Sequence, residues 1–185
     1  MAVDAFINFA ISDGTGMMPV KGETLDEFYS KVDPPAFEIK DFSFGVENPT
    51  TIGSATGGAG AGKIKFNEFT IKKTSDKASP AFFRNCCAGA HYKVVQIDMR
   101  KAGGEGTGAG KPFMRFRFEV VFTTKIDWSG PGDEGPEESI TFVYGKLGVV
   151  YIPQAQTGAA EPAKFTAAGW NQVTNKADEG GLSAT

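Results

Sequence analysis

Apolar and polar residues alternate along several stretches of this chain, which is the period of a β-strand with one buried face. In the first stretch the alternating apolar positions are Val3, Ala5, Ile7, Phe9 and Ile11, and Phe6 adds an apolar residue to the other face. The clearest alternation has its apolar positions at Met114, Phe116, Phe118, Val120 and Phe122. Further apolar series are Val95/Ile97/Met99, Ile140/Phe142/Tyr144 and Leu147/Val149/Tyr151. The pattern predicts a mainly β protein.

The apolar parity changes within some of these stretches. Phe37 and Ile39 share one parity and Phe42 and Phe44 the other, which predicts a β-bulge near Lys40. The same change occurs between Ile64/Phe66 and Phe69/Ile71, and again around Gly145. Repeated bulges are typical of strands that curl into a barrel.

The segment SPAFFRNCCAG, residues 79–89, carries helix signals. Ser79 is a candidate N-cap, Pro80 suits the first helical position and Gly89 suits the end. Its predicted buried stripe consists of Phe82, Phe83, Cys86 and Cys87. A disulfide between adjacent cysteines would distort the peptide, so we expect both to be reduced and buried.

Two long segments lack these patterns. Residues 12–35 combine Gly, Pro and charged residues and are expected to form a long projecting loop. Residues 155–185 are rich in Gly and Ala, and we expect an extended tail with one short docked piece and a frayed end. The length of 185 residues suits a single domain, 1–185.

Charge and hydropathy exclude some partners. The net charge is −3, whereas binding to nucleic acid requires a concentrated basic face. No apolar run approaches the roughly 20 residues of a membrane span, so we expect no membrane insertion. The N-terminal segment has no basic region before its apolar stretch, which predicts cytoplasmic synthesis without a signal peptide.

The segment GGAGAGK, residues 57–63, fits the spacing of a phosphate-binding loop. However, Ile64 stands where that loop needs a hydroxyl, and the next residues alternate as a strand instead of forming a helix. We therefore interpret the segment as a glycine-rich connection between strands.

No residue set predicts catalysis, a cofactor or a metal. His91 is the single histidine, and its spacing from Cys87 is interrupted by Gly89. The carboxylates Asp133, Glu134, Glu137 and Glu138 lie in a Gly/Pro-rich segment where solvation is the ordinary outcome. Arg115, Arg117 and Glu119 form the polar side of the clearest strand, either as a solvated sheet face or as the wet wall of a shared cavity.

Several segments, taken in order, resemble the haemolysin-coregulated protein (Hcp) family of the bacterial type VI secretion system. They are MAVDAFI, KGE, FSFG, GGAGAGK, DKASP, CCAGAHY, RKAGG, EESITF, YIPQ and GWNQVTNK, and they span nearly the whole chain. The sequence departs from the family pattern in a longer first connection, roughly residues 12–19, and in the additional segment GGEGTGAGK.

The resemblance implies a compact β-barrel of two antiparallel sheets with one short α-helix packed on its side. It further implies a structural tube subunit without catalysis or cofactor, which forms homohexameric rings that stack into a tube. The implied partners are further copies of the chain, the spike protein at the tip, the contractile sheath and small secreted effectors in the lumen. The protein would be made in the bacterial cytoplasm and exported through the type VI apparatus.

Two sets of residues are candidates for this assembly. The first, for ring stacking, lies in the loop that the family projects: Lys21, Glu23, Asp26, Glu27, Lys31 and Asp33. The second, for the lumen wall, comprises Arg115, Arg117 and Glu119. Two alternatives stay open, namely a tail-tube protein of another phage-derived contractile device and a β-sandwich module that binds a ligand.

Overall fold

The computed structural model describes residues 3–11, 17–51, 60–61, 63–101, 111–132, 135–155 and 160–184. Its longer strands are β1 (Val3–Ile11), β8 (Phe69–Thr74), β9 (His91–Lys101), β10 (Met114–Gly132), β11 (Gly135–Tyr151) and β12 (Thr166–Asn171). Its short strands are β2 (Phe37–Glu38), β3 (Asp41–Ser43), β4 (Val46–Glu47), β5 (Thr50–Thr51), β6 (Gly60–Ala61), β7 (Lys65–Phe66) and β13 (Lys176–Ala177). The helices are α1 (Ser79–Ala88) and the 3₁₀ turn η1 (Pro162–Lys164).

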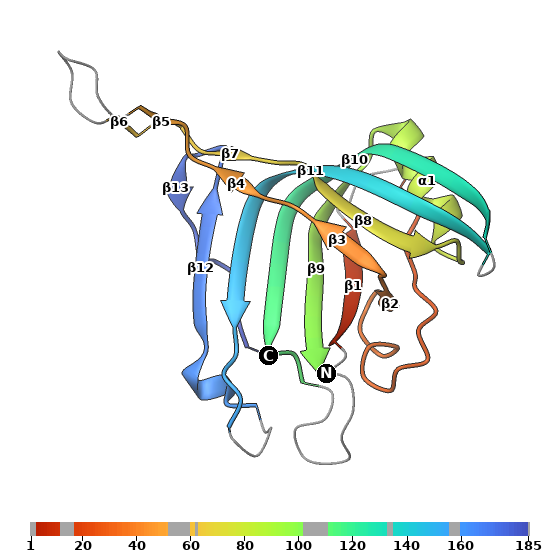
Figure 1. Cartoon of the computed structure of the whole chain (residues 1–185), viewed down its shortest axis with the longest axis horizontal. Helices are drawn as coiled ribbons and strands as arrows, with labels where there is room; N and C mark the ends of the chain where they lie inside the picture. The colour runs from red at the N-terminus through yellow and green to blue at the C-terminus, as the bar shows by residue number, and fades with distance from the viewer. Residues whose placement is uncertain are drawn as a thin grey trace.

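The strands are antiparallel and curl into a barrel (Figure 1). One continuous sheet runs in the order β13-β12-β11-β10-β9-β1-β2, and the upper half of β11 turns away to pair with β8, which pairs with β3. The circuit closes where the chain passes from β2 to β3, since Ile39 donates to Ala5 while Lys40 donates to Lys72. The bulge expected near Lys40 is therefore a strand that changes sheets.

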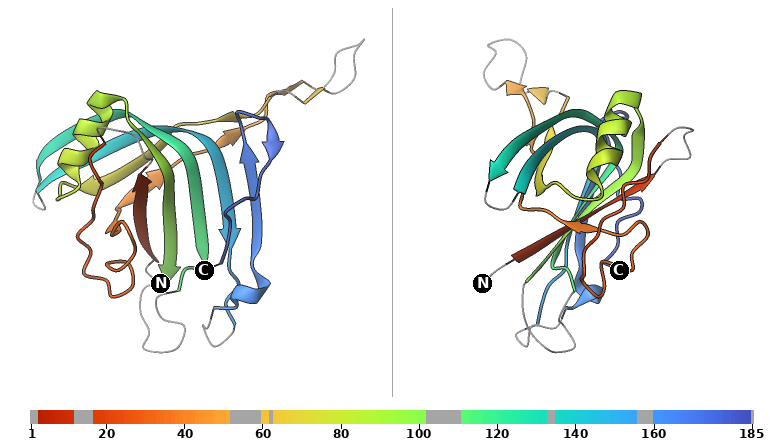
Figure 2. Two further views of the ribbon diagram at one scale, coloured as in Figure 1. Left: turned by 180° about the vertical axis from the view of Figure 1, so that it is seen from behind. Right: turned by 90° about the vertical axis from the view of Figure 1, so that its right-hand side faces the viewer.

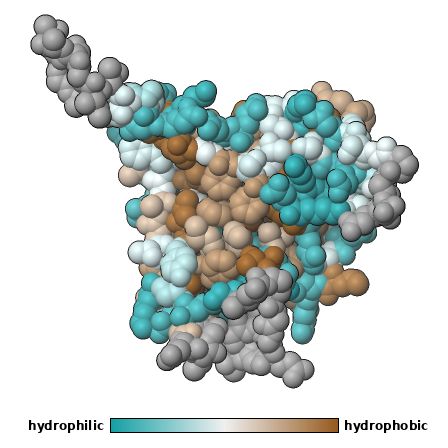
Figure 3. All heavy atoms as spheres, viewed as in Figure 1, coloured by the Kyte–Doolittle hydropathy of each residue, from teal (hydrophilic) through white to brown (hydrophobic). Residues whose placement is uncertain are grey.

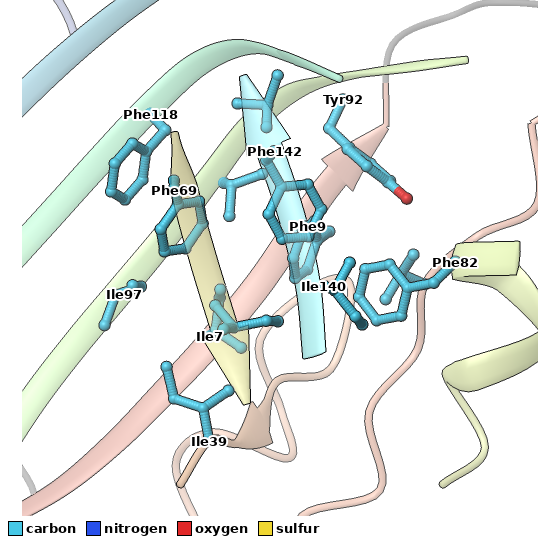
Figure 4. Packing of buried hydrophobic residues seen from close by; sticks show 14 of the residues in the cluster. Ile7, Phe9, Ile39, Phe69, Phe82, Tyr92, Ile97, Phe118, Ile140 and Phe142 are labelled. Carbon is cyan, nitrogen blue, oxygen red and sulfur yellow. The ribbon is translucent and has the colours of Figure 1, made fainter. Parts of the chain in front are cut away.

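Phenylalanine fills the barrel (Figure 4). Phe9, Phe69, Phe118 and Phe142 are fully buried, and the rings of Phe69 and Phe118 stack with centroids 4.3 Å apart. Such aromatic pairs add about 0.5–1.5 kcal/mol beyond the area that they bury. The mainly β fold with one α-helix confirms the prediction.

Helix α1 packs on the side of the barrel through Phe82, which meets Phe9 edge to face at 5.0 Å. Gly89 ends the helix in the left-handed conformation, at φ 63°, as its position predicted. The predicted stripe is wrong in part, because Phe83 is 55% exposed and Cys87 is exposed. A helix that touches the barrel along one side buries only that side.

The alternation predicted for β10 holds only up to Phe118. Val120 adopts φ 57°, so the chain turns over at this residue and Val121 takes the next buried position. Val120 and Phe122 consequently face outward, half-exposed. Val120 lies opposite Gly145, where the sequence indicated a parity change, and the register between β10 and β11 continues unchanged across this position.

Residues 17–36 are anchored along the barrel wall, and the expectation that residues 12–35 project stays a prediction. Val20, Tyr29 and Ala36 are buried, and Tyr29 stacks on Phe6 with ring centroids 4.1 Å apart. This contact explains why β1 carries an apolar residue on its second face. Residues 12–16 of the predicted loop lie outside the described residues.

A two-stranded ribbon projects from the barrel, built from β4 paired with β7 and β5 paired with β6 (Figures 1 and 2). It leaves the barrel at the end where Gln172 accepts a hydrogen bond from the backbone of Phe66. Half-exposed Val46 lies near its base. Two strands without a third are marginal in water, which makes the ribbon a candidate for contact with another molecule.

The C-terminal segment docks on the barrel instead of fraying. Its strand β12 pairs with β11, and residues 178–184 then cross the outer face of the sheet (Figure 2). Leu182 packs against Gly148 and Gly169, where no side chain would fit: a Cβ on Gly169 would lie 2.1 Å from the carbonyl oxygen of Asp178. Through the described parts of the chain, no helix has the length and apolarity needed to cross a bilayer.

Candidate assembly surfaces

The nucleotide interpretation gains nothing from the structure. Residues 57–59 and Gly62 lie outside the described residues, and Lys63 leads into strand β7 and then β8, without the helix that a phosphate loop requires. His91 is exposed and stacks on Phe122. Among the described residues, no group of three or more His, Cys, Asp or Glu side chains is placed to hold a metal ion.

One face of the large sheet is apolar and uncovered. Below β3 and β8, the inner faces of β9, β10, β11 and β12 continue past the barrel, and apolar residues gather there over β9, β10 and β11 (Figure 3). We call this surface the apolar sheet face; it consists of Met99, Met114, Phe116, Val149, Tyr151 and Ala168, which the strand register aligns. Tyr151 is 50% exposed. A surface of this kind marks a contact site.

The opposite face of the same strands is charged and partly covered. Arg115 donates from Nε to Asp98 Oδ1 at 2.7 Å and from Nη2 to Oδ2 at 3.0 Å, and from Nη1 to the carbonyl of Ser183 at 3.1 Å. The expectation of a solvated position is therefore wrong for Arg115, which the C-terminal residues bury. Arg117 and Glu119 form an ion pair of 2.9 Å with side chains about one quarter exposed, and whether they face a lumen stays a prediction.

The wall-following loop reaches the end of the barrel opposite the ribbon. There Phe28, Pro112, Ile152, Pro162 and Ala184 line an apolar pocket of about 250 Å³, together with Lys111, Arg115 and Ala160. We call this end the pocket end and the other the ribbon end. Leu25, on the same loop, is 99% exposed.

The loop places the predicted stacking residues in two groups. Lys21, Glu23, Glu27, Lys31 and Asp33 are exposed, with a surface pair between Lys31 and Glu27 at 3.6 Å. Asp26 is held inside the protein: it pairs with Arg100 and accepts the backbone N–H groups of Phe28 and Tyr29. Burial alone would raise the pKa of Asp26, but these bonds lower it overall. Asp26 therefore shapes the loop.

A buried charge network joins α1 to the barrel. Lys73, 1% exposed, contacts Asp76 Oδ1 at 2.7 Å, Ser79 Oγ at 3.4 Å and Glu138 Oε2 at 3.2 Å, and Trp128 donates from Nε1 to Glu138 Oε1 at 2.9 Å. The sequence expectation that Glu138 is solvated is thus wrong. The burial of Glu138 follows from the strand register, which sets Glu138 opposite Lys73, and this register cannot be read from the local sequence.

Comparison with known proteins identifies the family of this chain. Residues 11–151 match the family described as "Type VI secretion system effector, Hcp". The chain belongs to the Hcp family. This membership associates it with type VI secretion, as the ordered sequence segments indicated.

The relatives of this Hcp agree. It is 30% identical to Protein hcp1 of Pseudomonas aeruginosa over 112 residues, which cover 59% of this chain and 65% of that relative. A solved type six secretion system protein matches with a TM-score of 0.79 and 25% identity, over 96% of this chain and 100% of the other. Hcp1 of Salmonella typhimurium matches with a TM-score of 0.69 at 18% identity, over 96% and 100%, which supports the fold.

Proposed function

We propose that this Hcp is a tube subunit that closes into hexameric rings, and that the rings stack into a secretion tube. The observation that carries the proposal is the apolar sheet face. An isolated subunit would leave half-exposed Tyr151 and the partly exposed Phe116 and Val149 in contact with water, whereas identical neighbours around a closed rotation cover this face in every copy.

Stacking uses the two dissimilar ends of the barrel. The ribbon extends from one end, and the other carries the apolar pocket with half-exposed Phe28 at its wall. A head-to-tail stack brings the ribbon of one ring to the pocket end of the next. The exposed charges Lys21, Glu23, Glu27, Lys31 and Asp33 flank this contact, where they fix register more than affinity.

The finished tube has a lumen, a tip and an outer surface. Family membership supports small secreted effectors as the cargo of the lumen, the spike protein as the partner at the tip and the contractile sheath as the partner outside. Export through the type VI apparatus after cytoplasmic synthesis belongs to the same proposal. Arg117 and Glu119 are the lumen candidates that keep solvent access in one subunit.

Ring formation is tested with the variant Tyr151→Asp, which puts a charge on the apolar sheet face at a half-exposed position. Native mass spectrometry of the wild-type protein at micromolar concentration should give a hexamer, and negative-stain images should show rings. Tyr151→Asp should give monomers with an unchanged circular dichroism spectrum. Val143→Asp, a change on the same strand at a 40% exposed residue away from this face, is the matched control and should keep the rings. A wild-type protein that stays monomeric would overturn the proposal.

Stacking is tested separately with Val46→Asp at the ribbon and Phe28→Ser at the pocket end, where Phe28 is 53% exposed. Each variant should keep hexameric rings and lose the tubes that the wild-type protein forms at high concentration in electron micrographs. Tubes of normal length in both variants would refute this mode of stacking and leave ring formation untouched.

A further inference from the structure

A second apolar surface lies beside α1. Phe83 and Trp128 are 55% and 51% exposed, and their ring centroids are 6.1 Å apart. Cys87, four residues after Phe83 on the same side of the helix, is exposed too. We call Phe83, Cys87 and Trp128 the helix patch.

The helix patch is held rigidly, unlike most exposed aromatic residues. The indole N–H of Trp128 is bound to Glu138, and Glu138 is fixed by the buried Lys73, which also contacts Ser79 at the start of α1. With its polar atom satisfied inside the protein, Trp128 offers only its apolar ring to a partner. Rigid aromatic anchors of this type dominate the energetics of protein interfaces.

The two apolar surfaces differ in direction and composition. The apolar sheet face points toward the viewer of Figures 1 and 3, whereas α1 lies at the side of the barrel, next to the far end of the β10–β11 hairpin. Because the two surfaces point in different directions, a single twofold contact would not cover both of them. A head-to-tail contact between the two covers both, and its repetition generates a ring if the rotation closes.

The apolar sheet face ends at an edge strand, β12, which a second protein chain can approach. Beside it runs β12, and among the strands that the structure describes, β13 covers this edge only at Trp170 and Asn171. The edge at Thr166–Ala168 thus continues the apolar surface outward with unpaired backbone groups, which a neighbouring chain can approach.

We propose that, in the ring, the helix patch of one subunit packs on the apolar sheet face of the next, with Phe83 and Trp128 as the anchors. The inference rests on the proposed function and specifies the partner of its central surface. The occupant is a second copy of this chain in a heterologous contact, so every subunit gives one helix patch and receives another.

Cross-linking tests the contact, because the helix patch already has a thiol. In a Cys86→Ser background, Ala168→Cys puts a second thiol at the exposed edge of the apolar sheet face. A short bis-maleimide reagent should join Cys87 to position 168 of the neighbour and give a ladder of one to six subunits on a denaturing gel. Adding Cys87→Ser should abolish the ladder. Lys72→Cys, exposed on β8, replaces Ala168→Cys in the matched control and should give no ladder.

A second variant keeps the test independent of cross-linking. Phe83→Ser alters an exposed side chain and should leave the fold intact. Sedimentation velocity should show that its subunits associate into rings at least tenfold more weakly than those of the wild-type protein. Phe28→Ser, at the pocket end, should sediment as an intact ring. Rings without a ladder, cross-linked dimers alone, or a Phe83→Ser variant with full-strength rings would each overturn the inference and leave the proposed function standing. A wild-type protein without rings would overturn both.

Discussion

At the scale of single residues, the ion pair between Arg115 and Asp98 determines how the charged side of the sheet is used. Both side chains are less than one tenth exposed, and Tyr29 also donates to Asp98 from its hydroxyl. Burial raises the pKa of Tyr29, and the nearby Asp98 charge raises it further, so Tyr29 stays protonated at any physiological pH. The pair links the C-terminal residues, the sheet and the loop.

Asp98→Asn should be strongly destabilising, since it leaves the buried Arg115 without its counter-charge. We expect the free energy of unfolding to fall by about 3 kcal/mol. Chemical denaturation measures the change. Asp127→Asn, which breaks the exposed Lys125–Asp127 pair on the same sheet, is the control and should cost less than about 1 kcal/mol. Equal effects would show that Arg115 finds another partner.

Gly169→Ala should release the C-terminal residues. The added Cβ would meet the carbonyl of Asp178, a backbone atom that cannot turn aside, so Asp178 and Leu182 must move. The expected loss is about 1–3 kcal/mol, together with faster proteolysis of residues 178–184. Gly145→Ala, whose Cβ would lie 3.3 Å from a methyl group of Val173, is the milder control. A tail equally resistant in both variants would contradict this packing.

The sequence predicts residues well where a regular strand continues and poorly where a distant segment intervenes. Phe116 and Phe118 obey the alternation, but Phe122 does not, because Val120 adopts a left-handed conformation. No local sequence signal predicts that conformation. The burial of Arg115 depends on Ser183, 68 residues away. The periodicity of a strand does not predict burial by a segment that is distant in the sequence.

At the scale of elements, the attachment of α1 depends on pH through Glu138. Burial acts to raise the pKa of Glu138, but hydrogen bonds from Ser79 and Trp128 and the charge of Lys73 lower it below its ordinary value of 4.5. A carboxylate with a lowered pKa in the folded state stabilises the protein at pH values above the unfolded pKa. That contribution is lost as pH falls through the folded pKa.

We therefore predict that the stability of the protein declines as pH drops below about 4.5, and that Glu138→Gln weakens this decline. At neutral pH the variant should be less stable, because Lys73 loses its buried partner. Thermal unfolding from pH 7 to pH 3 gives both values. Glu137→Gln, at the exposed neighbouring residue that pairs with Lys40, should show the same dependence of melting temperature on pH as the wild-type protein. If both variants show the same pH dependence, Glu138 is excluded as the group that titrates.

The elements themselves were largely predictable. Gly89 ends α1 as expected, and the parity changes located the sheet switch near Lys40. The expected N-cap was wrong by one residue, because the helix begins at Ser79 and Ala78 is its N-cap. The anchoring of residues 17–36 to the barrel was not predicted, however. Gly, Pro and charges between residues 17 and 36 looked like a loop in solvent, yet Tyr29 and Val20 fasten it to the barrel, while the ribbon that begins with β4 extends outward.

At the scale of the whole molecule, the subunit has more apolar surface than its own elements cover. If rings bury that surface, dissociation precedes or accompanies unfolding, and the melting temperature of the wild-type protein should rise with protein concentration. Tyr151→Asp should melt at a temperature that does not depend on concentration. Differential scanning calorimetry over a hundredfold dilution checks this. A wild-type melting temperature that does not depend on protein concentration would exclude a contribution of ring formation to stability.

The two tryptophans of this chain lie in different surroundings. Trp128 is half-exposed on the helix patch, whereas Trp170 lies on β12 with its N–H buried and without a hydrogen-bond partner among the described residues. Association that covers Trp128 would move its emission toward the blue and protect it from iodide quenching. Replacing Trp170 with Phe would leave Trp128 as the single tryptophan. Excited selectively, at a wavelength that tyrosine does not absorb, it would report subunit association without any label.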